Sequence, residues 1–293
     1  MNEIHTTLHP SSFIPHTCPP RQASLFSLDG KVAIVTGALG LLGKQHCETL
    51  ADFGATVIIA DLDEKKCIGY AKELAIDCAT EVAGVGLDIT DTASLRNAYE
   101  LILARYGHID VLVNNAAVND SFENPLMAGE LSRFENYPLE AWERSLRVNV
   151  TGTFLASQIF GAEMAKAGKG SIINVASTYG IVGPDQSLYK RPDGTQSFYK
   201  SPSYSATKGA IIAFTRYLAA YWGPSGVRVN TLSPGGVENN QDEFFIQNYS
   251  QRTPLGHMAK TDDYRGALVF LASDASSYMT GANLVVDGGW TAW

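Results

Sequence analysis

The chain has 293 residues, of which 45% are hydrophobic and 18% are charged, as in an ordinary globular protein. Its formal net charge of −8 argues against a nucleic-acid-binding surface. The four cysteines form no closely spaced pair, so we expect reduced thiols, a cytoplasmic protein and no metal site. We see no secretory signal and no apolar stretch long enough to span a membrane, so we expect no membrane partner.

Residues 1–27 are rich in proline and histidine, which predicts an irregular N-terminal arm. Residues 28–293 alternate apolar strands with helices. We expect strands at 32–36, 56–61, 81–87, 110–114, 171–176, 227–232 and 283–287. Helices are expected at 42–53, 65–76, 92–106, 139–166, 203–221 and 262–273. This alternation predicts an α/β fold: a single Rossmann-type doubly wound domain, whose seven-stranded parallel sheet has helices on both faces.

A glycine-rich segment, Thr36–Gly43, follows the first expected strand and opens the first expected helix. Glycines there allow a tight turn and let a pyrophosphate approach the positive end of the helix. The segment therefore predicts a dinucleotide site, although a glycine-rich turn occurs in many α/β proteins.

Asp61 ends the second expected strand, where a carboxylate can bind the ribose hydroxyls of NAD and repel the 2′-phosphate of NADP. Because the glycine segment contains neither arginine nor lysine to bind that phosphate, the sequence favours NAD. Lys65 and Lys66 lie near enough in the chain to leave NADP open. Asp88 could bind the adenine amino group or simply cap the next helix.

Tyr204 and Lys208 lie one helical turn apart on the same face of an expected helix. An ammonium group beside a phenol favours the phenolate, so the tyrosine could exchange a proton near neutral pH. The alternative is a tyrosine and a lysine on a solvated helix face.

Across residues 27–289 the chain resembles the short-chain dehydrogenases/reductases. The motifs that carry the resemblance are TGALGLLG (Thr36 to Gly43), Asp88, NNAA (Asn114 to Ala117), NVTG (Asn149 to Gly152), SIINVAS (Ser171 to Ser177), YSATK (Tyr204 to Lys208), NTLSPGG (Asn230 to Gly236) and VVDGG (Val285 to Gly289). Each motif is weak alone, but together they occur in the family's order and on the matching elements.

The resemblance implies four catalytic residues, Asn149, Ser177, Tyr204 and Lys208. Tyr204 would move the hydroxyl proton, while Lys208 would lower its pKa and hold the cofactor ribose. Ser177 would orient the reacting oxygen. Asn149 would hold a water that links Lys208 to solvent.

The resemblance also implies the residues around the cofactor and the substrate. Expected cofactor contacts are Gly37, Leu39, Gly40, Leu41, Leu42, Asp61, Leu62, Asp88, Ile89, Asn115, Ala116, Ala117, Tyr204, Lys208, Pro234, Gly235 and Val237. Expected substrate contacts are Ser177, Tyr179, Arg191, Tyr204 and Gly236. Asn114 would also tie neighbouring strands together.

Among the departures from the family's common pattern, two bear on the substrate. Leu41 stands where the common branch has glycine, which resembles the extended branch that often acts on nucleotide sugars. The chain between Ser177 and Tyr204 is unusually long because of an insertion at about 184–202. Since it joins two catalytic residues, we expect it beside a polar, sugar-like substrate; the alternative is a surface loop or subunit contact.

The leading hypothesis is an NAD-dependent oxidoreductase that transfers a hydride between nicotinamide and a secondary alcohol or ketone. The alternatives are an epimerase or dehydratase with tightly bound NAD, and a catalytically silent NAD-binding protein. Residues 234–254 also resemble oxidoreductases encoded beside bacterial surface-sugar genes. Family resemblance further suggests a homotetramer or homodimer formed through the helices at 140–166 and 204–221.

Overall fold

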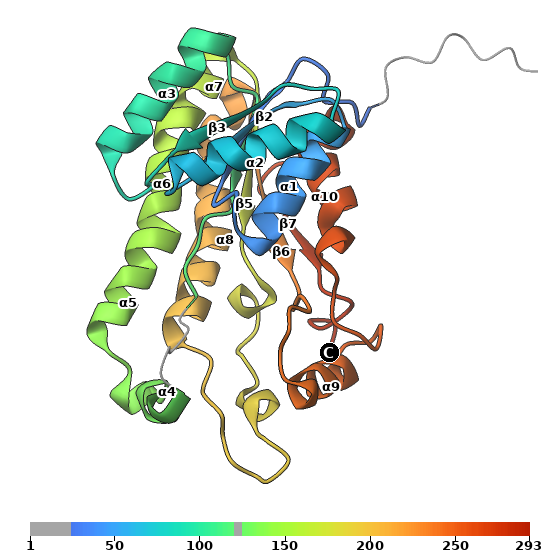
Figure 1. Ribbon diagram of the computed structural model, residues 1–293. Helices are drawn as coiled ribbons and strands as arrows, with labels where there is room; N and C mark the ends of the chain where they lie inside the picture. Colours follow the sequence, from blue (N-terminus) through green and yellow to red (C-terminus); the bar gives the residue numbers. More distant parts are fainter. Residues whose placement is uncertain (1–24, 120–124) are drawn as a thin grey trace, which may run out of the picture.

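The computed structural model describes residues 25–119 and 125–293 (Figure 1). The predicted arm, residues 1–27, therefore lies almost entirely outside the described residues. The described chain forms one parallel sheet of seven strands in the order β3-β2-β1-β4-β5-β6-β7. The strands are β1 (Val32–Thr36), β2 (Thr56–Asp61), β3 (Val82–Gly86), β4 (Val111–Asn114), β5 (Gly170–Val175), β6 (Val227–Pro234) and β7 (Asn283–Val286). The predicted doubly wound fold is confirmed.

Helices connect these strands and cover both faces of the sheet. They are α1 (Leu41–Asp52), α2 (Glu64–Asp77), α3 (Thr92–Tyr106), α4 (Pro125–Leu131), α5 (Leu139–Ser145), α6 (Thr153–Ala156), α7 (Ala162–Ala167), α8 (Pro202–Trp222), α9 (Glu243–Arg252) and α10 (Arg265–Ala272). Local signals set several ends: the Asp91 carboxylate accepts a hydrogen bond from Ala93 N before α3, and Gly107 ends that helix in the left-handed conformation.

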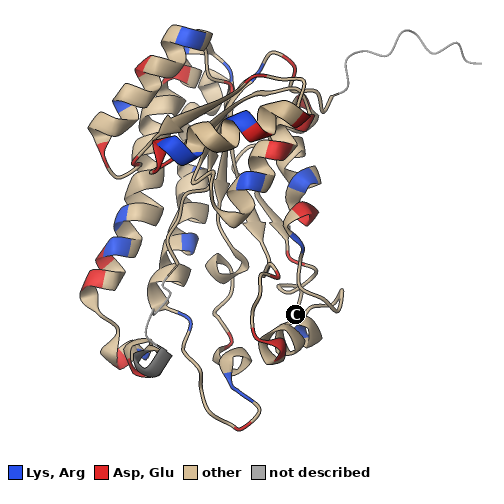
Figure 2. Ribbon diagram, in the orientation of Figure 1, with Lys and Arg blue, Asp and Glu red and all other residues tan. Residues whose placement is uncertain are grey.

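Two hydrophobic cores form on the two faces of the sheet. Helices α1, α2 and α10 pack on one face, and α3, α6, α7 and α8 on the other. The strands supply apolar side chains to both cores because successive residues point to opposite faces. Accordingly only Asp61 and Arg228 carry charge within the described strands, and Lys, Arg, Asp and Glu lie mainly on helices and loops (Figure 2).

The structure adds two helices that the sequence analysis missed, α4 and α9. It also changes the expected helix at 139–166. That helix runs on, but π-helical turns at Leu146–Gly152 and Ser157–Gly161 interrupt its α-helical hydrogen bonding. A π turn adds a residue to the turn and is frequent at functional sites, and Asn149 lies within the first one.

The insertion at 184–202 is folded against the body of the protein. A short helix at Gln186–Tyr189 buries Leu188 and Tyr189 in a third hydrophobic cluster with Tyr249 and Trp290. An ion pair between Asp185 and Arg252 joins the insertion to α9. In Figure 1 the segment lies between α8 and α9 at the lower end of the molecule.

A small hairpin forms the tip of the insertion. Lys190 and Gln196 form an antiparallel bridge, which leaves an exposed turn from Arg191 to Thr195. The base of the insertion is thus a packed wall, whereas its tip is exposed.

Within residues 25–119 and 125–293, no helix is long and apolar enough to cross a membrane.

Close packing of α2 on β3 predicts a strong effect of substitution at Gly84. A Cβ there would lie 2.3 Å from the main chain of Cys67 and Ile68. We expect Gly84→Val to lower the free energy of unfolding by about 1–3 kcal/mol, because backbone rather than a movable side chain must give way. Urea unfolding measures the change.

Gly69 is the matched control, because it lies inside α2 and a Cβ added to it would meet nothing within 4 Å. Gly69→Ala should raise stability by ~0.5–1 kcal/mol through helix propensity. Equal effects of the two changes would contradict this account of the packing.

Candidate active site

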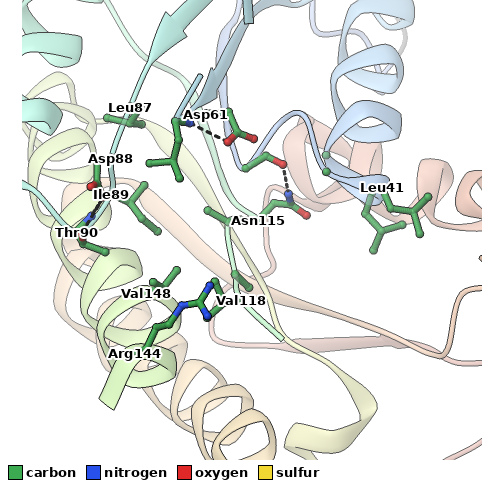
Figure 3. Close-up of a pocket in the computed structure, with 17 residues that line it drawn as sticks. Leu41, Asp61, Leu87, Asp88, Ile89, Thr90, Asn115, Val118, Arg144 and Val148 are labelled. Atoms are coloured by element: carbon green, nitrogen blue, oxygen red, sulfur yellow. Dashed lines mark hydrogen bonds between the residues drawn. The ribbon is translucent and has the colours of Figure 1, made fainter. Parts of the chain in front are cut away.

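A cavity of about 490 Å³ lies at the carboxyl ends of β1, β2, β3 and β4. Strand order reverses between β1 and β4, and such reversals open a crevice in parallel sheets. Figure 3 shows the residues around this space. Among the predicted cofactor residues, the lining includes Gly37, Gly40, Leu41, Leu42, Asp61, Leu62, Asp88, Ile89, Asn115, Ala116 and Ala117.

The glycine segment makes room for a close approach of two loops. Gly37 has a φ of 61°, and a Cβ on it would lie 2.6 Å from Ala116 Cα. Gly40 immediately precedes α1, so the amide groups that begin this helix face the cavity region. Because no side chain fits at Gly37, the main chain of this turn is free to bind the pyrophosphate of a dinucleotide.

Asp61 lies at the rim of this cavity with an ordered carboxylate. Its two oxygens accept hydrogen bonds from Leu39 N at 3.0 Å and Leu62 N at 2.8 Å. Each carboxylate oxygen can accept more than one hydrogen bond, so ribose hydroxyls can still bind. Leu39 therefore does not line the cavity itself; its main-chain amide holds the Asp61 carboxylate in place.

Hydrogen bonds hold the loop after β4 in place. The Thr36 hydroxyl accepts from Asn115 N and Ala116 N, each at 3.1 Å. Asn114 donates to Asn174 Oδ1 at 2.8 Å and Ser157 Oγ at 3.0 Å. The expectation that Asn114 ties neighbouring strands together is therefore confirmed, since Asn114 is on β4 and Asn174 on β5.

Asp88 also organises its own loop. Its carboxylate accepts from the Thr90 amide at 2.8 Å and the Thr90 hydroxyl at 2.7 Å. Asp91, not Asp88, caps α3. Of the two sequence interpretations, the helix-cap one is wrong, and the adenine contact stays a prediction.

Ser177, Tyr204 and Lys208 meet beyond the carboxyl end of β5. Ser177 follows that strand, while Tyr204 and Lys208 lie in the first two turns of α8. The Ser177 hydroxyl lies next to the Tyr204 side chain and favours its ionised form. Lys208 Nζ lies 5.8 Å from the centre of the Tyr204 ring and donates a 2.7 Å hydrogen bond to Val175 O. The structure thus brings together three of the four predicted catalytic residues.

Burial shifts the acidity of both titratable groups. It raises the pKa of Tyr204 above its ordinary value, and the neighbouring Ser177 hydroxyl acts in the opposite direction. It lowers the pKa of Lys208 to about 8, with a further contribution from the charge of Lys200. A lysine whose proton is so weakly held, beside a partly buried phenol, is typical of acid–base sites.

Asn149, the fourth predicted catalytic residue, is buried in the first π turn. Its side-chain amide donates to Val118 O and accepts from Val118 N, and it also donates to Thr207 Oγ1 at 3.1 Å. It therefore fixes the loop after β4 against α8. The proposed water-holding role stays a prediction.

Several other predicted residues lie outside the lining of the described cavity. Pro234, Gly235 and Val237 do not line the described cavity; Gly235 N bonds to Val286 O instead. Gly236 N donates to Tyr249 Oη at 2.6 Å. Arg191 is in the exposed turn of the insertion.

Tyr179 is buried close to Ser177, and its amide donates to the Ser177 hydroxyl at 3.2 Å. Sequence reasoning missed Arg144, which lines the cavity from α5 one turn before Val148 (Figure 3). Their spacing along one helix face was a usable signal. Sequence reasoning also could not place Lys200, because the position of this residue depends on how the insertion folds.

Comparison with known proteins identifies the family of this chain. A family model described as enoyl-(acyl carrier protein) reductase matches residues 37–291. The chain belongs to the short-chain dehydrogenase/reductase family. The match confirms the expected class, an NAD(P)-dependent oxidoreductase acting on CH–OH groups.

The relatives of this chain are named for diverse alcohol substrates. D-threitol dehydrogenase from Mycolicibacterium smegmatis is 35% identical over 91% of this chain and 95% of that protein. A 3-alpha-(or 20-beta)-hydroxysteroid dehydrogenase from Mycobacterium bovis is 36% identical over 90% and 91%. The structure of a gluconate 5-dehydrogenase from Burkholderia cenocepacia, in complex with NADP and tartrate, has a TM-score of 0.79 and 31% identity, covering 92% of this chain and 98% of that one.

The burial of Lys208 predicts that replacing this residue makes the ligand-free protein more stable. Its folded-state pKa of about 8 lies below the ordinary 10.5, so between these pH values the folded protein binds fewer protons than the unfolded chain. Stability therefore rises with pH in this window, and the charged lysine is unfavourable below it. Lys208→Met should stabilise the ligand-free protein at pH 7, on the order of 1–3 kcal/mol.

Urea unfolding at a series of pH values tests this, and the advantage should shrink as pH rises toward 10. Exposed Lys166→Met is the control and should show no such trend. A difference between Lys208→Met and the parent that is constant with pH would contradict the assignment.

Proposed function

We propose that this chain is an NAD-dependent dehydrogenase/reductase that interconverts a secondary alcohol and a ketone in a small, polar, polyhydroxylated substrate. The observation that carries the proposal is the meeting of Ser177, Tyr204 and Lys208 at the sheet edge that also bears the glycine cradle. Acid–base residues and a dinucleotide cradle on one edge are the parts that hydride transfer to or from an alcohol requires.

Each catalytic side chain then has a defined task. Tyr204 takes the hydroxyl proton during oxidation and returns it during reduction. Ser177, which lies next to Tyr204, holds the reacting oxygen beside that phenol. Lys208 favours the phenolate by its charge. The nicotinamide supplies the hydride chemistry when it is bound.

Asp61 supports NAD as the cofactor. Its carboxylate is fixed at the rim of the cavity by Leu39 N and Leu62 N, so it cannot easily turn away from a 2′-phosphate. Two negative groups held together in this way repel each other. Arg144 also lines the cavity, but it lies beside Val118 and Val148, away from Asp61 in Figure 3.

The residues that surround Tyr204 support a polar substrate. Lys200 Nζ, the Asn119 side chain and the Ser177 hydroxyl lie near this group, so the described wall offers hydrogen-bonding groups. Such a wall suits hydroxylated compounds, as the names of the threitol and gluconate relatives also suggest. The likeness of residues 234–254 to surface-sugar oxidoreductases stays a prediction.

An epimerase or dehydratase is the second candidate, favoured by Leu41 in the glycine segment. A catalytically silent NAD-binding protein is disfavoured because the acid–base residues are present together.

A homodimer or homotetramer accompanies this function in the proposal. Tyr217 and Tyr221 on α8 are 62% and 64% exposed and stack on each other, and Phe154 on α6 is 43% exposed. Exposed aromatic residues on adjacent helices are typical of an association surface. Analytical ultracentrifugation tests the assembly.

The three described cysteines are free thiols, which suits a reducing compartment such as the cytoplasm.

Replacement of the phenol tests the proposed reaction. Tyr204→Phe should retain NAD affinity but lose at least about a hundredfold in kcat for the best alcohol in a panel of polyols and aldonates, because the proton carrier is gone. Steady-state kinetics and NADH fluorescence measure the two effects. Near-normal kcat in this variant would rule out the assigned mechanism.

Asp61 controls cofactor choice in this proposal. NAD(H) should bind more tightly than NADP(H), and Asp61→Ser should narrow the preference by about 1–3 kcal/mol, since repulsion and ribose hydrogen bonds are both lost. Fluorescence titration with both cofactors measures it. Equal affinities in the parent protein would contradict the choice of NAD.

A further inference from the structure

Lys200, at the end of the insertion, lies against the proposed acid–base residue. Its Nζ is 4.2 Å from the centre of the Tyr204 ring, closer than Lys208 Nζ at 5.8 Å. It is also 6.0 Å from the centre of the Tyr179 ring. A cation at this distance over an aromatic face is attracted by the negative charge of the ring.

The position of Lys200 is built into the fold of the insertion. Lys200 N donates to Gln186 Oε1 at 2.8 Å, and Gln186 Nε2 donates back to Lys200 O at 3.2 Å. Gln186 belongs to the short helix that Leu188 and Tyr189 anchor in the third hydrophobic cluster. At the other end of the side chain, Lys200 Nζ donates to Asn119 Oδ1 at 2.9 Å.

We infer that Lys200 is a second positioning cation for Tyr204, which stabilises the phenolate through the face of its ring. The inference rests on the proposed function, because it assigns a role beside the same tyrosine. A phenolate ring carries more negative charge than a phenol ring, so a fixed cation above it favours loss of the proton. The insertion thereby contributes to catalysis and not only to the wall of the site.

The other groups around Tyr204 define what this cation must do. Lys208 faces the ring from the same helix, and Ser177 lies beside the phenol in the turn after β5. The neighbouring segments add Tyr179, Tyr189 and Asp185 as titratable groups. Burial raises the pKa of both of these tyrosines, so they stay protonated well above neutral pH. Asp185 is paired with Arg252, so the two lysines are the described groups over the Tyr204 ring that carry charge near neutral pH.

The two lysines also repel each other, which contributes to the lowered pKa of Lys208. Loss of Lys200 would thus have two opposite effects on Tyr204: it removes the nearer cation and strengthens the charge of the farther one. Because Coulomb energy falls with distance, the loss of the nearer cation dominates. Removing Lys200 should make Tyr204 harder to ionise.

The test compares Lys200→Met with Lys200→Arg, which keeps the charge. In alcohol oxidation, the acid limb of the pH profile of kcat/KM reports ionisation of the base. We expect Lys200→Met to move this limb upward by about one pH unit, and to lower kcat/KM about tenfold below it. Lys200→Arg should keep most of the parent profile, with NAD affinity unchanged in both variants.

Two further variants separate this role from a general effect on the insertion. Lys190→Met removes an exposed charge from the same segment and should leave the profile unchanged. Gln186→Leu removes the clamp on the Lys200 backbone and should give a smaller shift in the same direction. An unmoved acid limb in Lys200→Met, or an equal shift in Lys200→Arg, would overturn the inference.

A second measurement needs no substrate. Ultraviolet difference absorbance follows tyrosinate formation in the free protein, and subtraction of the Tyr204→Phe trace isolates Tyr204 among the 13 tyrosines. Its midpoint should rise in Lys200→Met and not in Lys190→Met. If Tyr204→Phe abolishes turnover while neither the profile nor this midpoint moves in Lys200→Met, the proposed function stands and the role of Lys200 fails.

Discussion

The close approach of two backbone segments at the reversal of strand order is the constraint on which the site depends. The loops after β1 and β4 touch where Gly37 meets Ala116, and no side chain fits between them. Gly43 continues the constraint, because a Cβ there would lie 2.2 Å from Gly37 O. This tight packing lets Thr36 hold the amides of Asn115 and Ala116, and it opens the cavity on the other side.

The proposed chemistry at this edge depends on a lysine that the fold holds in a buried position, where its charge is unfavourable. In the described structure Lys208 is buried and bonds to a main-chain oxygen, Val175 O, through its ammonium group. A carbonyl compensates an ammonium less well than a carboxylate does, so the proton is loosely held. The same burial opposes ionisation of Tyr204. The ionisation of the phenol and that of the lysine thus depend on each other, and on the elements that hold the two side chains together.

Much of the fold and the core of the site could be predicted because the signals are local. Continuous apolar runs marked the buried strands, and the spacing of Tyr204 and Lys208 placed them on one helix face. Helix α9 was missed because its burial depends on distant residues: Tyr249 stacks on Trp290 with ring centres 4.1 Å apart. The π turns were missed because hydrophobic periodicity does not distinguish them from an α-helix.

The contacts of the insertion illustrate the same limit. Its place beside Tyr204 could be expected from chain connectivity, but the pairing of Gln186 with Lys200 across the hairpin could not. Asn149 is similar, because its bonds to Val118 join segments that only the fold brings together. Long-range hydrogen bonds of this kind leave no periodic pattern in a sequence.

The hairpin at the tip of the insertion has a consequence for protein engineering. The bridge between Lys190 and Gln196 closes the turn from Arg191 to Thr195, and the Gln186–Lys200 clamp lies below it. Extra residues spliced between Asp193 and Gly194 would therefore extend into solvent while the bridge holds the stem. The tip is therefore a suitable place to insert a reporter peptide or an immobilisation tag.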